Sequence, residues 1–192
     1  MKPLHSLFPY AREFPASWLS LLSTIRVTVG APLVLAGGAL RDHFHSVPVK
    51  DLDFFLPYSE EAVEKLQDLF EAMGFDCIQN IGLSCSGLSE CAVVLGYSDG
   101  LGLTPSVNLI FLKPEYANGE RQMVERLDFG ICQIGVFFND QDNVEFYYTD
   151  AFVDDVAKLT FTLTRDTDQE RSLRRFHRLQ EKYPYHRLVT RG

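Results

Sequence analysis

Two short stretches decide how this chain folds: Leu35-Ala-Gly-Gly-Ala-Leu-Arg-Asp42 and, downstream of it, Asp51-Leu-Asp-Phe54. The first overlaps an apolar run, Leu33–Ala36, which indicates a short buried strand that the glycine pair then breaks. A short helix over Ala39–His45 is expected next. The second stretch opens an apolar run over 51–56 that predicts a further strand. The two stretches together predict a strand–turn–helix–strand unit with a glycine turn and an acidic pair.

The acidic pair lies on one face of the predicted strand, because side chains alternate along a strand and one residue separates Asp51 from Asp53. Two carboxylates on one face repel each other unless a cation lies between them. Mg²⁺ prefers carboxylate oxygens together with phosphate oxygens and water. Asp51 and Asp53 are therefore candidate metal ligands. Because D-x-D is a common pattern, the alternative is an exposed acidic pair at the start of a strand.

The glycine turn has features that bind phosphate. Gly37 and Gly38 let backbone N–H groups approach phosphate oxygens, and the N-terminus of the following helix favours negative charge. Arg41 lies one turn into that helix, where its guanidinium could clamp a phosphate, and Asp42 could orient Arg41. A simple tight turn is the alternative interpretation of the glycines. Combined with the acidic pair, however, the turn supplies the second half of a metal–triphosphate site.

The rest of the chain is predicted to contain helices and strands, without internal repeats or low-complexity segments. Apolar spacing predicts helices over 15–28, between the cap Ser59 and Gly74, near 151–158, and from about Asp168 to Tyr183. Strands are predicted over 76–81, 91–97, 106–112 and near 144–148, and the apolar residues 129–138 fit a helix or a strand. This order predicts an α/β (α+β) domain, in which a small mixed sheet is packed by helices.

Composition and charge limit the partners of the chain. Its 192 residues suit one domain, or one domain plus an appendage, and an apolar fraction of 46% is enough to bury a core. The formal charge is −8, but residues 165–192 hold eight Lys/Arg and four Asp/Glu, so the remainder is strongly acidic. An acidic body argues against non-specific coating of nucleic acid, whereas the basic C-terminal segment could contact a polyanion.

The cysteines and the hydropathy pattern are typical of a reduced, cytoplasmic protein. No pair of cysteines has the C-x-x-C spacing of a zinc site, so free thiols are expected at Cys77, Cys85, Cys91 and Cys132. The sequence shows no secretory signal, and no apolar run approaches the roughly 18 residues that span a membrane. A membrane partner is therefore not expected.

The two opening stretches together resemble the head domain of the tRNA nucleotidyltransferase and bacterial poly(A) polymerase family, within the DNA polymerase β-like superfamily. That family reads G-G-x-x-R-D followed by D-x-D-F. A second stretch, Arg126-Leu-Asp-Phe-Gly-Ile-Cys-Gln133, is similar to the family's R-R-D-F-T-x-N-A segment, which lies near the nucleotide. A third, Ser172-Leu-Arg-Arg-Phe-His-Arg-Leu179, resembles the arginine-rich neck helix that follows the head. The similarity covers residues 35–180 in the family's order.

The resemblance implies a polymerase β-like nucleotidyltransferase head over 1–160 and a helical, neck-like segment over 161–192, in the same compact unit. It implies that Asp51 and Asp53 are catalytic and hold Mg²⁺ or Mn²⁺, with a nucleoside triphosphate as substrate. The nucleotide-binding positions carried over from the motifs are Gly37, Gly38, Arg41, Asp42, Arg126 and Asp128. The candidate acceptor-binding positions on the neck helix are Arg171, Arg174, Arg175 and Arg178.

The sequence departs from the family pattern at several positions. Leu127 replaces the second arginine of R-R-D-F. The best match to the neck motif E-D-x-x-R, which selects the incoming base in the family, is Glu170-Arg-Ser-Leu-Arg174, with Arg171 in place of the aspartate. The family's base selectivity is therefore not carried over. The chain stops soon after the neck, as expected of a minimal relative similar to small nucleotidyltransferases of phages and toxin–antitoxin systems.

Many members of the superfamily carry a third carboxylate on a neighbouring strand, and the corresponding position here is Asn108. An amide can bind a metal weakly or hydrogen-bond a water, but it cannot act as a general base. Asp128 is the other candidate for a supporting acid. Its alternative roles are a helix N-cap or an ion-pair partner of Arg126.

The implied reaction is in-line attack of a hydroxyl on the α-phosphate of a nucleoside triphosphate, with release of pyrophosphate. The basic final helix favours RNA, in particular the 3′ end of a tRNA, as the acceptor. Nucleotidylation of a protein or small molecule, as in some toxin-like relatives, is the alternative that the acidic body favours. A non-catalytic regulator that binds a nucleotide or a partner protein is the third hypothesis, supported by Asn108 and Leu127.

Overall fold

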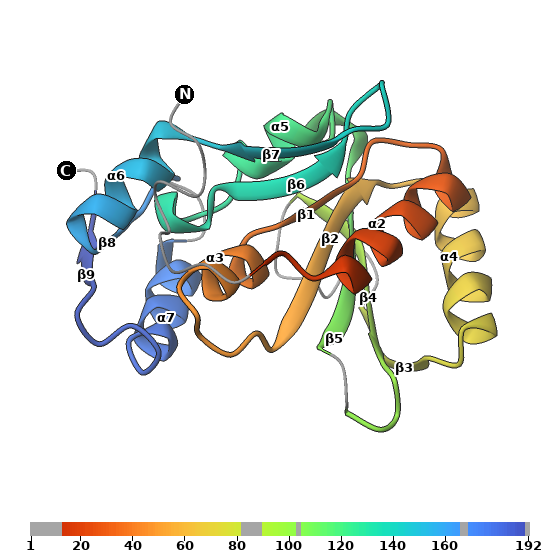
Figure 1. Cartoon of the computed structure of the whole chain (residues 1–192), viewed down its shortest axis with the longest axis horizontal. Coiled ribbons are helices and arrows are strands. Elements are labelled where there is room, and N and C mark those ends of the chain that lie inside the picture. The colour runs from red at the N-terminus through yellow and green to blue at the C-terminus, as the bar shows by residue number, and fades with distance from the viewer. Residues whose placement is uncertain (1–12, 82–89, 103–104, 166–168, 191–192) are drawn as a thin grey trace.

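The computed structural model describes residues 13–81, 90–102, 105–165 and 169–190, and its centre is a seven-stranded sheet (Figure 1). The strand order is β3-β4-β5-β2-β1-β6-β7; β2 and β5 pair in parallel, and the other described neighbours pair antiparallel. The strands are β1 (Val34–Ala36), β2 (Asp51–Pro57), β3 (Asp76–Ile81), β4 (Cys91–Ser98), β5 (Ser106–Leu112), β6 (Ile134–Phe138) and β7 (Val144–Tyr148). A second, two-stranded parallel sheet joins β8 (Thr160–Thr162) to β9 (Arg187–Val189).

Helices pack against both faces of the large sheet. They are α2 (Ala16–Val29), α3 (Gly38–Phe44), α4 (Glu60–Ala72), α5 (Glu120–Glu125), α6 (Asp150–Lys158) and α7 (Gln169–Leu179), with short 3-10 helices η1 (Pro114–Tyr116) and η2 (Gly130–Cys132). Buried residues of α2 and α4 belong to the main core, and those of α5 belong to a second apolar cluster on the other face. The sheet is therefore enclosed between helices, as expected from the order of elements.

Alternation along β2 separates the two faces of the sheet. Leu52, Phe54 and Leu56 are buried in the main core, whereas Asp51 and Asp53 are only partly buried and point to the opposite face. The strand therefore holds its two carboxylates rigidly, because burying three large apolar side chains on one face fixes the register of the other.

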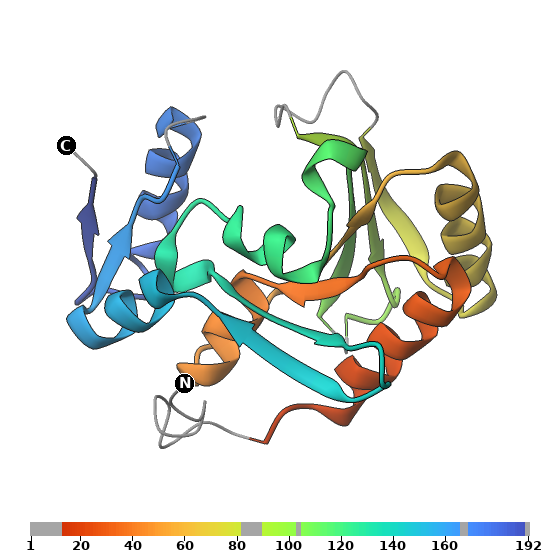
Figure 2. The same ribbon diagram turned by 90° about the horizontal axis from the view of Figure 1, so that it is seen from above.

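The C-terminal residues pack onto one end of the large sheet through an apolar cluster of their own. Phe161 of β8, Phe176 of α7 and the following Tyr183 are buried against Phe129 and Ile131, which precede β6. Figure 2 shows α7 and the β8–β9 pair at one end of the molecule and α4 at the other. The packing brings α7 beside the sheet face that carries the two carboxylates.

The expected fold class is confirmed, one open choice is decided, and four local features, namely α5, β8, β9 and the end of the last helix, differ from the sequence-based predictions. Residues 129–138 form η2 and then β6, which resolves the choice between helix and strand in favour of a strand. The short elements α5, β8 and β9 were not predicted. The last helix ends at Leu179 instead of Tyr183, and Pro184 disfavours a helical conformation at Tyr183 itself. The expected helix start at Asp168 lies outside the described residues.

Two further sequence expectations can be compared with the structure. Among the described residues, no helix combines the length and apolar character needed to cross a membrane. Cys77, Cys91 and Cys132 are free thiols as expected, and Cys85 lies outside the described residues.

Candidate functional site

A cavity of about 450 Å³ opens on the sheet face that carries the acidic pair. Its walls come from β2 to β5, from the turn between β1 and α3, from the segment after α5, and from α7. The sequence-predicted site residues that line it are Gly37, Gly38, Asp51, Asp53, Asn108, Arg126, Asp128, Arg171, Arg175 and Arg178. Those that do not line it are Arg41, Asp42 and Arg174.

The acidic pair and Asn108 form the centre of the cavity wall. Asn108 lies opposite Asp53 in the parallel β2–β5 pair, and its Nδ2 donates a hydrogen bond to Asp53 Oδ1 at 2.8 Å. Burial raises the pKa of the Asp53 carboxyl, and the negative charge of Asp51 adds to this, while the hydrogen bond from Asn108 opposes it. The pair is therefore electrostatically unfavourable on its own and would gain from a cation.

The donor set suits a hard divalent cation that is shared with a substrate. Asp51 and Asp53 offer carboxylate oxygens, and in the described part of the chain no cluster of three or more His, Cys, Asp or Glu side chains is arranged for metal binding. Mg²⁺ usually takes one or two carboxylates and completes its shell with water and phosphate oxygens. Two carboxylates in a cavity rimmed by arginines fit that pattern.

The glycine turn lies at the edge of the cavity. Gly37 has a φ of 81°, in the left-handed region that glycine tolerates, and this allows β1 to turn directly into α3. The Gly37 N–H donates to the Ile134 carbonyl at 2.9 Å, so it is not available to a phosphate. Gly38 opens α3, where the first backbone N–H groups have no partner within the helix. Only the second glycine therefore keeps the predicted role as a backbone donor.

Arg41 and Asp42 are buried behind the cavity. Arg41 Nε and Nη2 donate to Asp42 Oδ1 at 2.7 and 2.5 Å, and Arg41 Nη1 donates to Cys132 Sγ at 3.1 Å. Asp42 also accepts from Tyr183 Oη and Lys182 Nζ, each at 2.8 Å. Asp42 thus orients Arg41 as the sequence suggested, but the guanidinium is held toward the C-terminal segment.

The segment after α5 places Arg126 and Asp128 on the cavity wall without pairing them. Arg126 lies over the Tyr116 ring, 4.3 Å from its centroid, and forms an ion pair with Glu90. Asp128 Oδ1 accepts from Arg175 of α7 at 2.7 Å. The suggested Arg126–Asp128 ion pair is therefore wrong: tertiary packing provides each residue with a distant partner. Asp128 is also not an N-cap, since it lies between the end of α5 and the N-cap of η2.

One face of α7 forms the wall opposite the sheet. Arg171, Arg175 and Arg178 line the cavity at helical spacing, and Arg174 is exposed on another side of the helix, where it pairs with Glu170 at i,i+4. Among the described residues, Arg171 and Arg178 have no ion-pair partner. Glu170 and Arg174, which match the first and last positions of the neck motif E-D-x-x-R, both lie outside the cavity. The sequence match over 170–174 is therefore not accompanied by a matching site.

The fold resembles that of solved tRNA-processing enzymes. The complex of a CCA-adding enzyme with ATP aligns with a TM-score of 0.62 and 15% identity, over 97% of this chain and 42% of that one. The Thermotoga maritima CCA-adding enzyme complexed with tRNA gives 0.60 and 13%, over 100% and 43%. A tRNA nucleotidyltransferase complexed with a primer tRNA and an incoming ATP analogue gives 0.59 and 16%, over 86% and 46%. The chain has the nucleotidyltransferase head fold.

The likeness is one of fold, since identity is low and the chain spans less than half the length of these solved structures. No protein-family model matches the sequence, and no curated protein matches it.

Three charged or amide side chains of the cavity, Gln79, Glu90 and Arg165, were missed by sequence reasoning. Glu90 forms ion pairs with both Arg126 and Arg165, and Gln79 of β3 lines the far wall. No local pattern marks Glu90 or Arg165, because they meet only after the C-terminal segment packs against the sheet. The alternation of β3 was the one available signal for Gln79.

Proposed function

We propose that the cavity is the active site of a metal-dependent nucleotidyltransferase, which transfers a nucleoside monophosphate from a nucleoside triphosphate to an acceptor hydroxyl. One observation carries this proposal: Asp51 and Asp53 share a single cavity with a row of arginines from α7. A magnesium–triphosphate complex carries cation and anion together, so it needs carboxylates on one side and guanidinium groups on the other.

Asp51 and Asp53 would hold Mg²⁺ or Mn²⁺ through carboxylate oxygens that Asn108 leaves free. A bound metal would lower the pKa of the attacking hydroxyl and neutralise charge on the transferred phosphate. Asn108 keeps Asp53 in one orientation by its hydrogen bond, so the carboxylate needs little rearrangement when a cation binds.

Phosphates would bind between Gly38 and the cavity face of α7. Arg171 and Arg178 have no ion-pair partner among the described residues, and Arg175 is fixed in place by Asp128. These arginines share the cavity with the carboxylates. A triphosphate whose metal ion is held by the carboxylates would therefore lie within reach of the guanidinium groups. Arg41 and Asp42 would support the α3 turn from behind. We propose that 1–160 and 161–192 act as one unit, since each supplies a wall of the site.

RNA, and in particular the 3′ end of a tRNA, is the favoured acceptor class. The aligned enzymes are described with tRNA and with nucleoside triphosphates, and the exposed Arg174, on the solvent side of α7, would contact a polyanion. A protein or small-molecule acceptor is the second candidate. It is favoured by the absence of Lys and Arg from β3, β4 and β5, the strands that form the far wall.

The acidic pair gives the decisive test. We expect Asp51→Asn and Asp53→Asn each to abolish incorporation of labelled nucleotide while circular dichroism and thermal unfolding remain native-like, because the amide keeps the shape but loses the charge. Asp68→Asn, on the exposed side of α4, is the matched control and should retain activity. An active Asp51→Asn/Asp53→Asn double variant would contradict the metal assignment.

The acceptor class follows from the same assay with a mixture of acceptors. The wild-type protein is incubated with Mg²⁺, each labelled nucleoside triphosphate in turn, and total RNA or cell lysate. Labelled RNA supports the first acceptor class, and labelled protein or metabolite supports the second. Nucleotide binding without any transfer would identify a non-catalytic regulator and contradict the proposed activity.

A further inference from the structure

The cavity changes from polar to apolar along the strands of the sheet. Its polar half holds the acidic pair and Asn108, which lies opposite Asp53. In the next row of the same face, Phe55 lies opposite Ile110 and Ile110 opposite Val94, and all three side chains are only partly buried. Apolar side chains that stay partly open inside a cavity suit the face of a flat ring. This half of the cavity therefore fits the base of a nucleotide whose phosphates lie in the polar half.

Three charged side chains close the apolar half. In the last row of this wall Leu112 lies opposite Cys91, four residues along β5 beyond the polar row, and four residues of strand span about 13 Å. Glu90, which precedes Cys91, forms ion pairs with Arg126 and Arg165, and all three line the cavity. A nucleotide also has polar groups at two ends, the phosphates and the hydrogen-bonding edge of its base. The charged cluster of Glu90, Arg126 and Arg165 lies where that edge would reach.

The Glu90 carboxylate keeps one acceptor position open. Its Oε1 accepts from Nη2 of both Arg126 and Arg165, which occupies the two lone pairs of that oxygen. Among the described residues, its Oε2 accepts only from Arg126 Nε, at 3.3 Å. Each guanidinium uses two of its five N–H groups in the described part of the chain, because the second bond of Arg165 goes to the Arg126 carbonyl at 2.7 Å. The cluster thus offers one acceptor between two groups of donors.

The charges of the cluster disfavour a phosphate. A phosphate here would lie against the Glu90 carboxylate, and like charges in contact repel each other. Arg171 and Arg178 offer guanidinium groups that have no acidic partner in the part of the chain that the structure describes. The triphosphate therefore belongs beside α7. A neutral group with hydrogen-bonding atoms on its edge remains as the ligand of the charged cluster.

The order of donors and acceptors favours one base. A central acceptor with donors on both sides complements an edge that reads acceptor, donor, acceptor, and uracil presents this edge through O4, N3–H and O2. Cytosine and adenine place a ring-nitrogen lone pair at the central position, where it would face the Glu90 carboxylate. Guanine places two donors side by side, whereas Glu90 has one open acceptor position. Polar groups left unpaired in such a site are costly, so each of these three bases is disfavoured.

We propose that Glu90, Arg126 and Arg165 select uracil as the base of the nucleoside triphosphate. The inference rests on the proposed nucleotidyl transfer and adds the identity of the transferred nucleotide. The N3–H of the base donates to Glu90 Oε2, and its two carbonyl oxygens accept from the guanidinium groups on either side. The ring lies against Ile110 and Val94 of the apolar wall. Glu90 is thus a specificity-determining residue, which acts on the base and not on the reacting phosphate.

The decisive test varies the base and leaves the protein unchanged. Full-length wild-type protein is given Mg²⁺, total RNA or cell lysate as the source of acceptor, and each of the four common ribonucleoside triphosphates in turn. We expect initial rates at low nucleotide concentration to favour UTP over CTP by about tenfold or more, because CTP leaves the Glu90 carboxylate without a donor. N3-methyluridine triphosphate should be as poor as CTP, and ribothymidine triphosphate, which keeps the same edge, should be used like UTP.

A variant of the cluster should remove the preference. We expect Glu90→Gln to bring the ratio of UTP to CTP rates toward unity, because the charged acceptor is lost. A purely structural role of Glu90 would lower both rates alike and leave the ratio unchanged. Glu145→Gln is the matched control, since Glu145 forms an ion pair with Arg121 and does not line the cavity. If Glu90→Gln does not fold, the nucleotide series on the wild-type protein decides alone.

Calorimetric binding of the same nucleotides, with Mg²⁺ and without acceptor, separates the base assignment from the activity. Transfer without preference for UTP, or an unchanged ratio in folded Glu90→Gln, overturns the base assignment and leaves nucleotidyl transfer standing. Selective binding of UTP without transfer to any acceptor supports the base assignment and overturns the proposed transfer. Equal binding of all four nucleotides without transfer overturns both.

Discussion

Asp42 is the residue on which the junction between α3 and the C-terminal segment depends. Its carboxylate accepts hydrogen bonds from Arg41, Tyr183 and Lys182, and both Asp42 and Arg41 are buried. A buried guanidinium is stable only while its counter-charge is present. One carboxylate therefore holds together residues that are far apart in the sequence.

We expect Asp42→Ala to lower the free energy of unfolding by about 3–5 kcal/mol, because it leaves the Arg41 guanidinium buried without a counter-charge. Urea denaturation followed by circular dichroism measures this. Asp154→Ala removes an exposed i,i+4 pair with Lys158 and should cost less than about 1 kcal/mol. Equal effects of the two substitutions would show that the Asp42 network adds nothing to stability.

At the residue scale, the sequence predicted the placement of those side chains that follows from alternation along a single strand. The shared face of Asp51 and Asp53 is a property of any strand, and the structure has both on the cavity wall. The partners of Asp128 and Arg126 could not be predicted, because Arg175 and Glu90 reach them through tertiary packing. An ion pair between distant segments leaves no pattern in a single sequence.

Among the elements, α7 divides its arginines between two environments. Arg171, Arg175 and Arg178 face the cavity, whereas Arg174 faces solvent. The helix is anchored by Phe176, which is buried with Phe161 in the C-terminal cluster. The buried Phe176 determines which arginines of α7 face the carboxylates. A change in the packing of this helix would therefore also move its charged side chains.

We expect the double variant Arg171→Ala/Arg178→Ala to raise KM for the nucleoside triphosphate by about tenfold or more, because charge-assisted hydrogen bonds to phosphate are lost. Steady-state kinetics at saturating acceptor measure this. Arg174→Ala, on the solvent side of the same helix, is the control and should leave that KM unchanged. If Arg174→Ala raises KM for the triphosphate equally, the cavity face has no special role.

At the element scale, long periodic segments were predictable and short ones were not. The helix between Ser59 and Gly74 is α4: Ser59 Oγ accepts from the Ala62 N–H at 3.1 Å, and Gly74 takes a φ of 77° just beyond its end. The three-residue strands β8 and β9 carry too few residues for a period, and they form by pairing with each other. These strands form where the C-terminal segment packs in its apolar cluster. The periodicity of the sequence gives no information about such packing.

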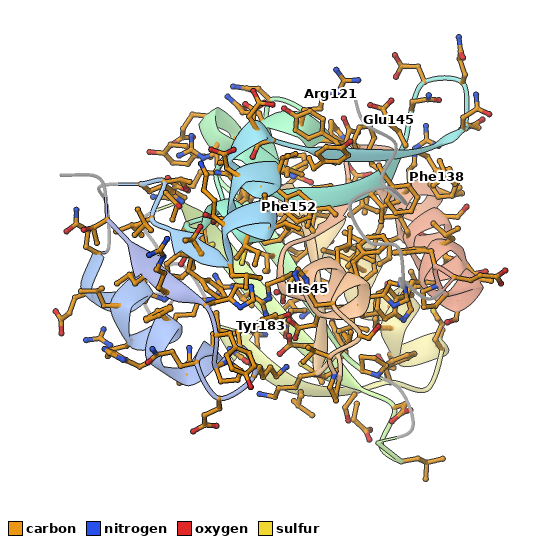
Figure 3. All side chains as sticks on the ribbon, turned by 60° about the vertical axis from the view of Figure 1, so that its left-hand side comes forward. His45, Arg121, Phe138, Glu145, Phe152 and Tyr183 are labelled. Carbon is orange, nitrogen blue, oxygen red and sulfur yellow. The ribbon has the colours of Figure 1, made fainter. Side chains whose placement is uncertain are left out.

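For the whole molecule, the C-terminal segment and the head meet at a group of rings around His186. His45, the residue after α3, lies beside Tyr183 (Figure 3), and the rings of both approach His186 at 6.0 and 5.0 Å between centroids. Burial lowers the pKa of the His186 imidazole, and the nearby His45 and Arg41 lower it further against the opposing effect of Asp155. Both ring nitrogens of His186 lack a hydrogen-bond partner among the described residues.

The junction should weaken in acid. A folded-state pKa below the unfolded value of about 6.5 means that the unfolded chain binds the proton more readily, so stability is complete above that pH and falls as pH drops through it. We expect the thermal midpoint to decrease between pH 7.5 and 5.5, with head and C-terminal segment melting together. His186→Phe should reduce this decrease, and His177→Ala, at an exposed position, should not. An unchanged pH dependence in His186→Phe would contradict the assignment.

The position of β1 in the centre of the sheet has a consequence for biosynthesis. One edge of β1 pairs with β2 through Leu35 and Phe54, which leave the ribosome close together, but the other edge pairs with β6 through Leu35 and Val136. During translation, the apolar edge of β1 therefore stays open until most of the chain has emerged. Non-local pairings of this kind form slowly and expose strand edges to other nascent chains. The interval between synthesis of β2 and of β6 is thus when this strand edge is open to pairing with another chain.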